Sequence, residues 1–194
     1  MIVKRARDDM HGRSRSGGFT LLELMIAVTI TAILLAVVGP SFRTTIQNSR
    51  RAAIVNEVLG ALQLARSEAL KQNKATQICP SVSLTACSTT ASDWSKGWLS
   101  FVEGTGTCSS TRPDTSSACG DVVLKAAANG YDGVTIMATV TNIRFLSFNG
   151  TISGNRTLTF CDARGATEAR AIVMDPSGRP RISTSDGAGN ALGC

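Results

Sequence analysis

The sequence lacks the side chains and motifs on which most catalytic and metal centres depend. Its only histidine is His11, so the chain beyond it has no imidazole to act as a base or a metal ligand. Glycine-rich phosphate loops, dinucleotide-binding fingerprints and nucleophile elbows are all missing. Its carboxylates are scattered beside turns, which is typical of backbone capping: Asp121, Asp132, Asp162 and Asp175. The sequence therefore indicates a protein that is not an enzyme and that uses no cofactor or metal.

The chain also lacks a strong excess of charge once its first residues are set aside. The net charge is +6, and residues 1–18 contribute +3 of it through five basic and two acidic side chains. From Phe19 onward, 15 basic and 12 acidic side chains leave a net charge of +3. This balance is too small to predict nucleic-acid binding from composition alone.

Cysteine is missing from the first 75 residues, and no Cys-x-x-Cys pair occurs anywhere. This spacing, with no histidine beyond His11, excludes a structural zinc site. An even number of cysteines after an export signal instead predicts disulfides in an oxidising compartment. Six cysteines allow 15 connectivities, among which sequence proximity favours Cys79–Cys87 and Cys108–Cys119, with Cys161–Cys194 as the remainder.

One long apolar run, residues 19–42, has 24 residues and a single charge. As a helix it would be about 36 Å long, which is enough to cross a bilayer core of roughly 30 Å. A secretory signal peptide would carry its small residues after the apolar core, but here Gly17 and Gly18 precede it. We therefore predict a retained transmembrane helix, with the basic residues 1–18 in the cytoplasm and the remainder in the periplasm.

Glu23 is the one charge in this run, and a carboxylate inside a membrane helix usually marks a function. Cleavage after Gly18 would create a positive amine on Phe19, one helical turn from Glu23. The carboxylate would then pair with this amine in its own chain or with that of a neighbouring subunit. The alternative is a side chain that reaches the membrane surface. Further along, the Gly39-Pro40 pair is expected to bend or melt the helix.

The residues Gly18-Phe19-Thr20-Leu21-Leu22-Glu23 resemble the prepilin peptidase signature of type IV pilins and type II secretion pseudopilins. The resemblance implies that residues 1–18 are a leader, cleaved between Gly18 and Phe19, and that Phe19 is then N-methylated. It also implies that Glu23 guides docking in a filament. The expected partners are the prepilin peptidase, the inner membrane and other pilins.

The helical pattern resumes over residues 43–73, where apolar residues recur at intervals of three and four. Residues 74–194 form a β-rich globular domain in which turn residues separate short strands. We expect strands at 76–79, 98–102, 122–126, 134–138, 143–148, 157–161, 170–174 and 179–183, with a hairpin at Asn149-Gly150. The predicted fold is α+β and pilin-like, with a long N-terminal helix packed on antiparallel sheets and disulfide staples.

A second resemblance concerns the β-rich part of the chain. Several short segments are similar to the FimT/GspH family of minor pilins and pseudopilins: Cys79-Pro80, Cys87, Asp93-Trp94, 97–101, Phe160-Cys161 and 178–181. The loop 104–121 has no counterpart in this resemblance. Trp94 and Trp98 are expected to be large core side chains.

The segment Asp175-Pro176-Ser177-Gly178 predicts a tight turn, because proline presets the second position and glycine accepts a positive φ. Strand alternation after the turn predicts that Arg179 and Arg181 share one face. Pro180 predicts an edge strand. Composition alone favours a solvated, charged edge that discourages aggregation. A Gly-Arg-x-Arg element here resembles the DNA-binding motif of the FimT branch, which implies that Gly178, Arg179 and Arg181 bind DNA.

Two functions fit this sequence. The first is a minor type IV pilin of the FimT branch, which moves from the inner membrane to the cell surface. It would bind the sugar-phosphate backbone of double-stranded DNA, without reading its sequence, for natural transformation. The second is a structural GspH-type pseudopilin of a type II secretion system, for which the arginines do not matter.

Overall fold

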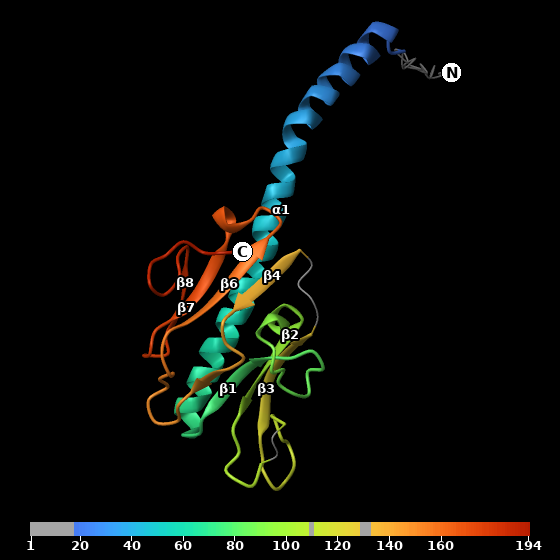
Figure 1. Ribbon diagram of the computed structural model, residues 1–194. Coiled ribbons are helices and arrows are strands. Elements are labelled where there is room, and N and C mark those ends of the chain that lie inside the picture. The colour runs from blue at the N-terminus through green and yellow to red at the C-terminus, as the bar shows by residue number, and fades with distance from the viewer. Residues whose placement is uncertain (1–17, 109–110, 129–132) are drawn as a thin grey trace, which may run out of the picture. The chain divides into compact units, whose positions relative to one another are not determined.

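The computed structural model describes residues 18–108, 111–128 and 133–194 (Figure 1), without the side chains of residues 37–41 and 128. The chain divides into two compact units, Met1–Thr44 and Thr45–Cys194. Of the leader predicted over residues 1–18, only Gly18 is described.

The single long helix, α1, spans Leu21–Gln72 and continues from the first unit into the second. Its backbone is helical through Gly39 and Pro40, so this pair does not melt the helix, and the predicted bend stays a prediction. A proline removes one backbone donor from a helix, and the turns on either side continue the hydrogen-bonded ladder. The helix ends before Asn73, which has a φ of +49°. An asparagine in the left-handed region is a common helix stop, and the end agrees with the predicted one.

In the first unit, the large apolar side chains between Phe19 and Leu35 are all more than half exposed. Within the described part of the chain, no helix combines the length and the apolar character that a membrane crossing requires. The transmembrane segment predicted over residues 19–42 therefore stays a prediction.

The second unit contains two four-stranded sheets, and all of their strand pairs are antiparallel. In the first sheet the order is β3-β2-β1-β5, with β1 at Thr76–Pro80, β2 at Gly97–Val102, β3 at Val122–Ala128 and β5 at Ile143–Phe145. In the second the order is β4-β6-β7-β8, with β4 at Val134–Ala138, β6 at Arg156–Asp162, β7 at Arg170–Met174 and β8 at Pro180–Ser183. Short 3₁₀ helices lie at Ala91–Ser95 (η1) and Ala166–Glu168 (η2). Each strand overlaps one of the predicted strands.

The turn at Asn149-Gly150 does not join two paired strands. The strand before it, β5, pairs with β1 in the first sheet, whereas the strand after it, β6, pairs with β4 and β7 in the second. The hairpin predicted there is wrong, because Asn-Gly specifies a tight turn but not which strand each flanking segment pairs with. The turn instead carries the chain from one sheet to the other.

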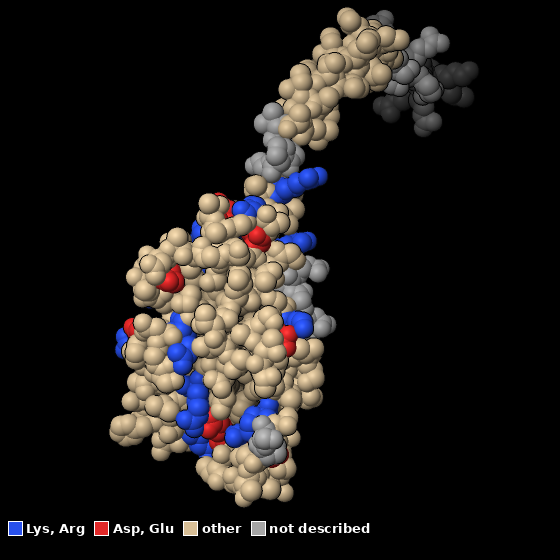
Figure 2. Space-filling model, viewed as in Figure 1, with Lys and Arg blue, Asp and Glu red and all other residues tan. Residues whose placement is uncertain are grey.

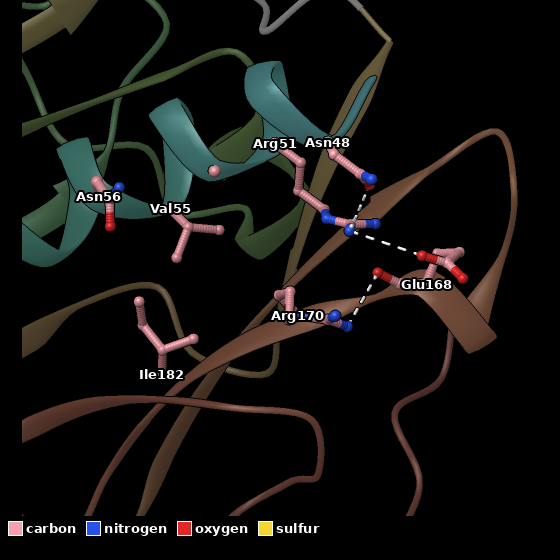
Figure 3. Close-up of a pocket in the computed structure, with 8 residues that line it drawn as sticks. Asn48, Arg51, Val55, Asn56, Glu168, Arg170 and Ile182 are labelled. Atoms are coloured by element: carbon pink, nitrogen blue, oxygen red, sulfur yellow. Dashed lines mark hydrogen bonds and ion pairs between the residues drawn. The ribbon is translucent and has the colours of Figure 1, made fainter. Parts of the chain in front are cut away.

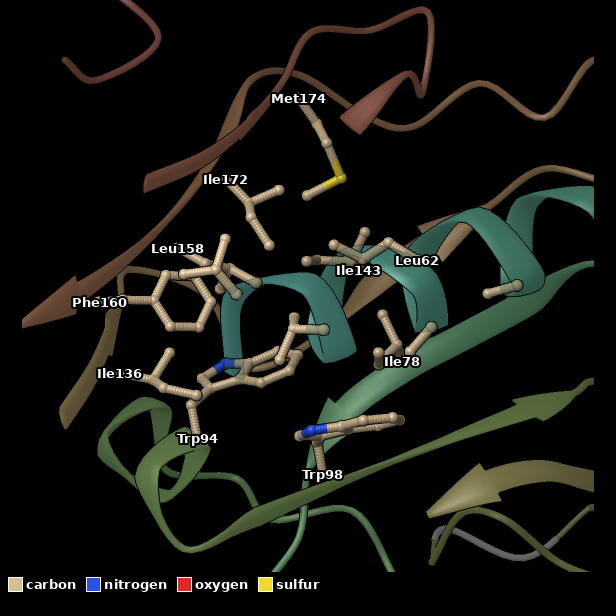
Figure 4. Close-up of a cluster of buried hydrophobic side chains, with 14 of the residues drawn as sticks. Leu62, Ile78, Trp94, Trp98, Ile136, Ile143, Leu158, Phe160, Ile172 and Met174 are labelled. Atoms are coloured by element: carbon tan, nitrogen blue, oxygen red, sulfur yellow. The ribbon is translucent and has the colours of Figure 1, made fainter. Parts of the chain in front are cut away.

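The hydrophobic core lies between the second half of α1 and both sheets (Figure 4). The helix contributes Val55, Val58, Leu62, Ala65 and Ala69, all buried. Trp94 and Trp98 are fully buried beneath it, as predicted. The indole Nε1 of Trp94 donates to the Val140 carbonyl at 2.8 Å, which satisfies its one polar group. The predicted α+β fold, a helix packed on antiparallel sheets, is confirmed.

Three disulfides tie loops to this core. They join Cys79 to Cys87, Cys108 to Cys119 and Cys161 to Cys194, which are the pairs that sequence proximity favours. The third bond spans 33 residues and anchors the C-terminus to β6. Since a cross-link constrains the unfolded chain, the bond with the longest loop contributes most in the loop-entropy account.

A buried ion network attaches α1 to the end of β6. Arg51, which is 5% exposed, places Nη1 3.1 Å from Oδ2 of Asp162. Asp162 also accepts hydrogen bonds from Arg164, through Nη2 at 2.6 Å and Nε at 3.0 Å. Glu168 lies 3.8 Å from Arg51 across a groove that Arg170 and Ile182 also line (Figure 3). Within the groove Arg51 pairs with Glu168, and Arg170 donates to the Glu168 and Ala169 carbonyls, so these contacts join the helix to the segment before β7.

This network predicts an acid-sensitive stability. The hydrogen bond from the Arg164 guanidinium, above all, lowers the pKa of Asp162 from 3.8 to about 2. A lowered folded-state pKa stabilises the fold above pH 3.8, and the stabilisation is lost as the pH falls towards 2. We expect a loss of ~2 kcal/mol in unfolding free energy over this range, measured by denaturant unfolding at several pH values. Asp162→Asn should remove this part of the pH dependence, and an unchanged dependence would contradict the assignment.

Candidate nucleic-acid interface

The turn between β7 and β8 has the conformation that its sequence predicts. The Gly178 amide donates to the Asp175 carbonyl at 2.9 Å, and Gly178 has a φ of +71°. Asp175 also accepts from the Ser177 amide at 3.0 Å and from the Ser177 hydroxyl. Backbone and side chain together therefore close the turn.

This turn packs tightly on a second turn and, through it, on α1. Gly178 is buried, and a Cβ at this position would lie 2.1 Å from the carbonyl oxygen of Gly150. The Ile152 amide donates to the Pro176 carbonyl at 3.1 Å. On its other side, a Cβ on Gly150 would lie 3.2 Å from Cγ of Arg66 and 3.3 Å from Cγ of Leu70. We call this stack of the 175–178 turn, the 149–151 turn and the Arg66–Leu70 segment of α1 the turn stack.

Arg179 and Arg181 are both exposed, but they do not share a face. Arg181 pairs in register with Val173, whose side chain is buried on the face away from α1. Arg179 precedes β8 and lines a groove beside α1 together with Gln63, Arg66, Ser67, Leu70 and Pro180. The same-face prediction is wrong because strand alternation begins only at Pro180. The predicted edge position is confirmed, since β8 is the last strand of its sheet.

The charge around the turn stack is positive and largely uncommitted. Elsewhere in the second unit four arginines form ion pairs: Arg51, Arg112, Arg144 and Arg164. Among the described residues, neither Arg179 nor Arg181 forms one. Asp175 is the acid of the turn itself: the Ser177 hydroxyl, above all, lowers its pKa, and both arginines add smaller effects in the same direction. Three guanidinium groups, those of Arg66, Arg179 and Arg181, against the carboxylates of Asp175 and Glu68 give the turn stack and the two arginines after it a net charge of +1.

Arg66 is fixed beneath this surface. Its Nη2 lies 3.5 Å from the Ser177 carbonyl. Its Nε is buried and, in the part of the chain that is described, has no hydrogen-bond partner. A buried unpaired donor is costly, and this nitrogen is covered by the 149–151 turn, since a Cβ on Gly150 would lie 3.4 Å from it. The sequence pattern did not identify Arg66, since its contact with the turn joins residues 111 positions apart.

The other carboxylates that the sequence places beside turns have structural roles where they are described. Asp121 is buried and accepts from the Gly104 and Asp114 amides, each at 2.7 Å. It also binds the Arg112 guanidinium. Asp162 belongs to the ion network, and Asp132 lies outside the described residues.

The residues of the predicted processing site are exposed in the first unit. Gly18 and Phe19 precede α1, and Phe19 is 82% exposed. A Cβ added to Gly18 would meet no atom within 4 Å, so the packing of the described chain does not require a glycine at this position. The Thr20 hydroxyl accepts from the Glu23 amide at 3.2 Å. Thr20 and Glu23 thus have capping-box spacing, which the sequence prediction did not use. A carboxylate in the first turn also interacts favourably with the helix dipole.

A helix lying on two antiparallel sheets, preceded by a prepilin-type N-terminal motif, defines a protein of the type IV pilin-like class. The family described as Type II transport protein GspH matches residues 55–178, and the prokaryotic N-terminal methylation motif matches residues 13–39. The first match covers 124 of 194 residues, and the chain belongs to the GspH family.

Two crystal structures of the type IV minor pilin FimU from Pseudomonas aeruginosa are similar to this chain. One is 24% identical with a TM-score of 0.49, over 71% of this chain and 90% of FimU. The other is 23% identical with a TM-score of 0.48, over 68% and 91%. No curated protein matches the chain significantly.

The family defines the chain as a minor pilin or pseudopilin, which is a structural subunit. Membership implies assembly with other pilins, and the methylation motif implies processing by a prepilin peptidase. The motif also indicates a membrane-anchored pilin with a soluble C-terminal domain.

The turn stack predicts that Gly178→Ala destabilises the protein. The added Cβ would collide with the Gly150 carbonyl and would also occupy a positive φ. We expect a loss of about 2–4 kcal/mol in unfolding free energy, measured by denaturant unfolding. Gly120→Ala is the matched control, because its φ of +76° is similar and its Cβ would meet nothing within 4 Å. Equal losses in the two variants would contradict the close contact between the turns.

Proposed function

We propose that this protein is a minor type IV pilin of the FimT branch that binds extracellular DNA for uptake in natural transformation. One observation carries the proposal: Arg179 and Arg181 are exposed cations without ion-pair partners among the described residues, and they follow a turn that packs tightly on the 149–151 turn. The resemblance of Gly178-Arg179-Pro180-Arg181 to the DNA-binding element of the FimT branch supports it.

The mechanism follows from the chemistry of the guanidinium group. Arginine presents donors in a planar fork that matches the oxygens of a phosphate. With Arg179 on the side of α1 and Arg181 on the opposite face of β8, the two groups would contact phosphates on either side of the hairpin. Contacts of this kind position DNA but read no sequence. Since the turn is already fixed, binding orders few backbone torsions, which lowers its entropic cost.

The charged surface fits this description. Figure 2 shows lysine and arginine side chains gathered on the lower half of the second unit, with few acidic side chains among them. Within the turn the acid is Asp175, whose lowered pKa keeps it ionised at neutral pH. Its charge partly offsets the arginines, so the expected affinity is modest and strongly dependent on salt.

Assembly depends on the N-terminal unit in this proposal. Cleavage between Gly18 and Phe19 frees an amine, which is N-methylated, and Glu23 of a neighbouring subunit pairs with it during docking. The exposed apolar side chains from Phe19 to Leu35 then pack in the membrane and later in the filament. Retraction of the pilus carries the bound DNA towards the cell.

A structural role in type II secretion is the second candidate, and the description of the matched family favours it. Such a pseudopilin needs the helix and Glu23 but has no use for exposed arginines on the β7–β8 turn. DNA binding by the purified protein therefore distinguishes the two functions.

The direct test is a titration of duplex DNA into the full chain in detergent at several salt concentrations. We expect Arg179→Glu/Arg181→Glu to stay folded but to lose most of its affinity, because two phosphate contacts are replaced by repulsion. The slope of log affinity against log salt should fall by about 2.

Two further variants make the titration specific to this site. Arg43→Glu/Arg50→Glu changes the net charge equally at exposed positions of α1, and it should retain most of the affinity. Asp175→Asn keeps an oxygen for the turn but removes the negative charge, and it should bind about two- to fivefold more tightly. Equal losses in both double variants, or no salt dependence in the parent, would reject the proposed site.

Mass spectrometry of protein extracted from cells tests the processing step. We expect a chain that begins at methylated Phe19 and lacks residues 1–18. Gly18→Val should fold normally, since a Cβ there meets nothing within 4 Å, yet it should retain Met1. Intact Met1 in the parent protein, in cells with an active prepilin peptidase, would contradict cleavage at this bond.

A further inference from the structure

The side chain of Phe148 is anomalous in the second unit. It is 88% exposed, whereas the other described aromatic side chains of this unit are fully buried: Trp94, Trp98, Phe101, Phe145 and Phe160. Exposing a phenyl ring to water forgoes the favourable burial of a large apolar surface. A ring in this position therefore points to a ligand or partner that covers it.

Phe148 has no evident role in holding its own turn together. The Leu146 amide donates to the Thr151 carbonyl at 2.9 Å, and the Gly150 amide donates to the Leu146 carbonyl at 3.0 Å. Asn149 completes the turn, because its Oδ1 accepts from the Thr151 amide at 3.1 Å and the Thr151 hydroxyl at 2.7 Å. Backbone groups and Asn149 thus fix the turn without the ring.

The turn that carries Phe148 is the middle layer of the turn stack. Phe148 is two residues from Gly150, Gly150 touches Gly178, and Arg179 follows Gly178. At about 3.5 Å of chain per residue, the backbones of Phe148 and Arg179 lie within roughly 15 Å of each other. Neighbouring nucleotides of one strand span this distance in two or three steps. An exposed aromatic ring and exposed arginines therefore lie within reach of a single short oligonucleotide.

We propose that Phe148 is a stacking platform for an unpaired nucleobase, so that the site takes a single-stranded stretch of DNA. The inference rests on the proposed function and deepens it: the arginines hold phosphates, and the ring covers the face of one base. Every base has such a face, so stacking tolerates any sequence. In a duplex the bases already stack on one another, and the ring gains nothing there.

The test compares three probes with the full chain in detergent: a single strand of fifteen thymidines, a fifteen-base-pair duplex, and an abasic strand of the same length. Phe148→Ala should weaken binding to the thymidine strand on the order of tenfold. It should leave binding to the duplex and to the abasic strand unchanged. The salt slope should stay as in the parent, since no phosphate contact is lost.

Matched variants separate stacking from apolar contact in general. Phe148→Trp keeps an aromatic face and should retain the affinity, whereas Phe148→Leu keeps apolar area without that face and should lose it. Val82→Ala removes another exposed apolar side chain (58% exposed) and should have no effect. All of these positions are exposed, so the variants should fold like the parent.

The outcomes distinguish this inference from the function on which it rests. If Arg179→Glu/Arg181→Glu loses binding to all three probes while Phe148→Ala loses none, base stacking is rejected and DNA binding stands. A protein partner would then be the better occupant for the ring. If the arginine variant retains full binding to all three probes, DNA binding at this site is rejected, and the stacking role of Phe148 is rejected with it. Equal losses of Phe148→Ala on the strand, the duplex and the abasic probe would also reject stacking.

Discussion

The close contact between Gly150 and Gly178 is the constraint on which the candidate site depends. No side chain fits between the Gly178 α-carbon and the Gly150 carbonyl, where a Cβ would lie 2.1 Å from the oxygen. The same Gly150 rests on Arg66 and Leu70 of α1. The core beneath the helix thus fixes the turn before β8 and, with it, the start of the strand that carries the exposed arginines. A longer side chain at either glycine would separate the layers, and the cations would lose their fixed relation to the helix.

Much of the fold could be predicted because its signals are local. Strand positions follow from short apolar runs between turn residues, and the end of α1 follows from Asn73, whose φ is positive. The β7–β8 turn follows from the order of proline and glycine in residues 175–178. Local loops also explain the disulfides: two of the three bonds close 8 and 11 residues, and the third pair is then the only one left.

The remainder could not be predicted, because it depends on which distant segments meet. Asn149-Gly150 signals a turn, but only the packing of two sheets on one helix decides that the strands around it separate. The faces of Arg179 and Arg181 depend on where β8 begins, and one residue reverses that assignment. The contact of Arg66 with the Ser177 carbonyl and the ion pair of Arg51 with Asp162 each join residues 111 positions apart. The Thr20 cap is different, since its capping-box spacing was readable in the sequence.

Family membership establishes a pilin-like subunit, whereas the turn stack bears on what such a subunit presents on its surface. We propose that DNA contacts the turn stack, and the amide chemical shifts of the full chain, followed during titration with DNA, test this contact most directly. We expect the largest changes in residues 146–152, 175–181 and 66–70. Changes concentrated instead on the ion network around Arg51, or none at saturating DNA, would contradict it.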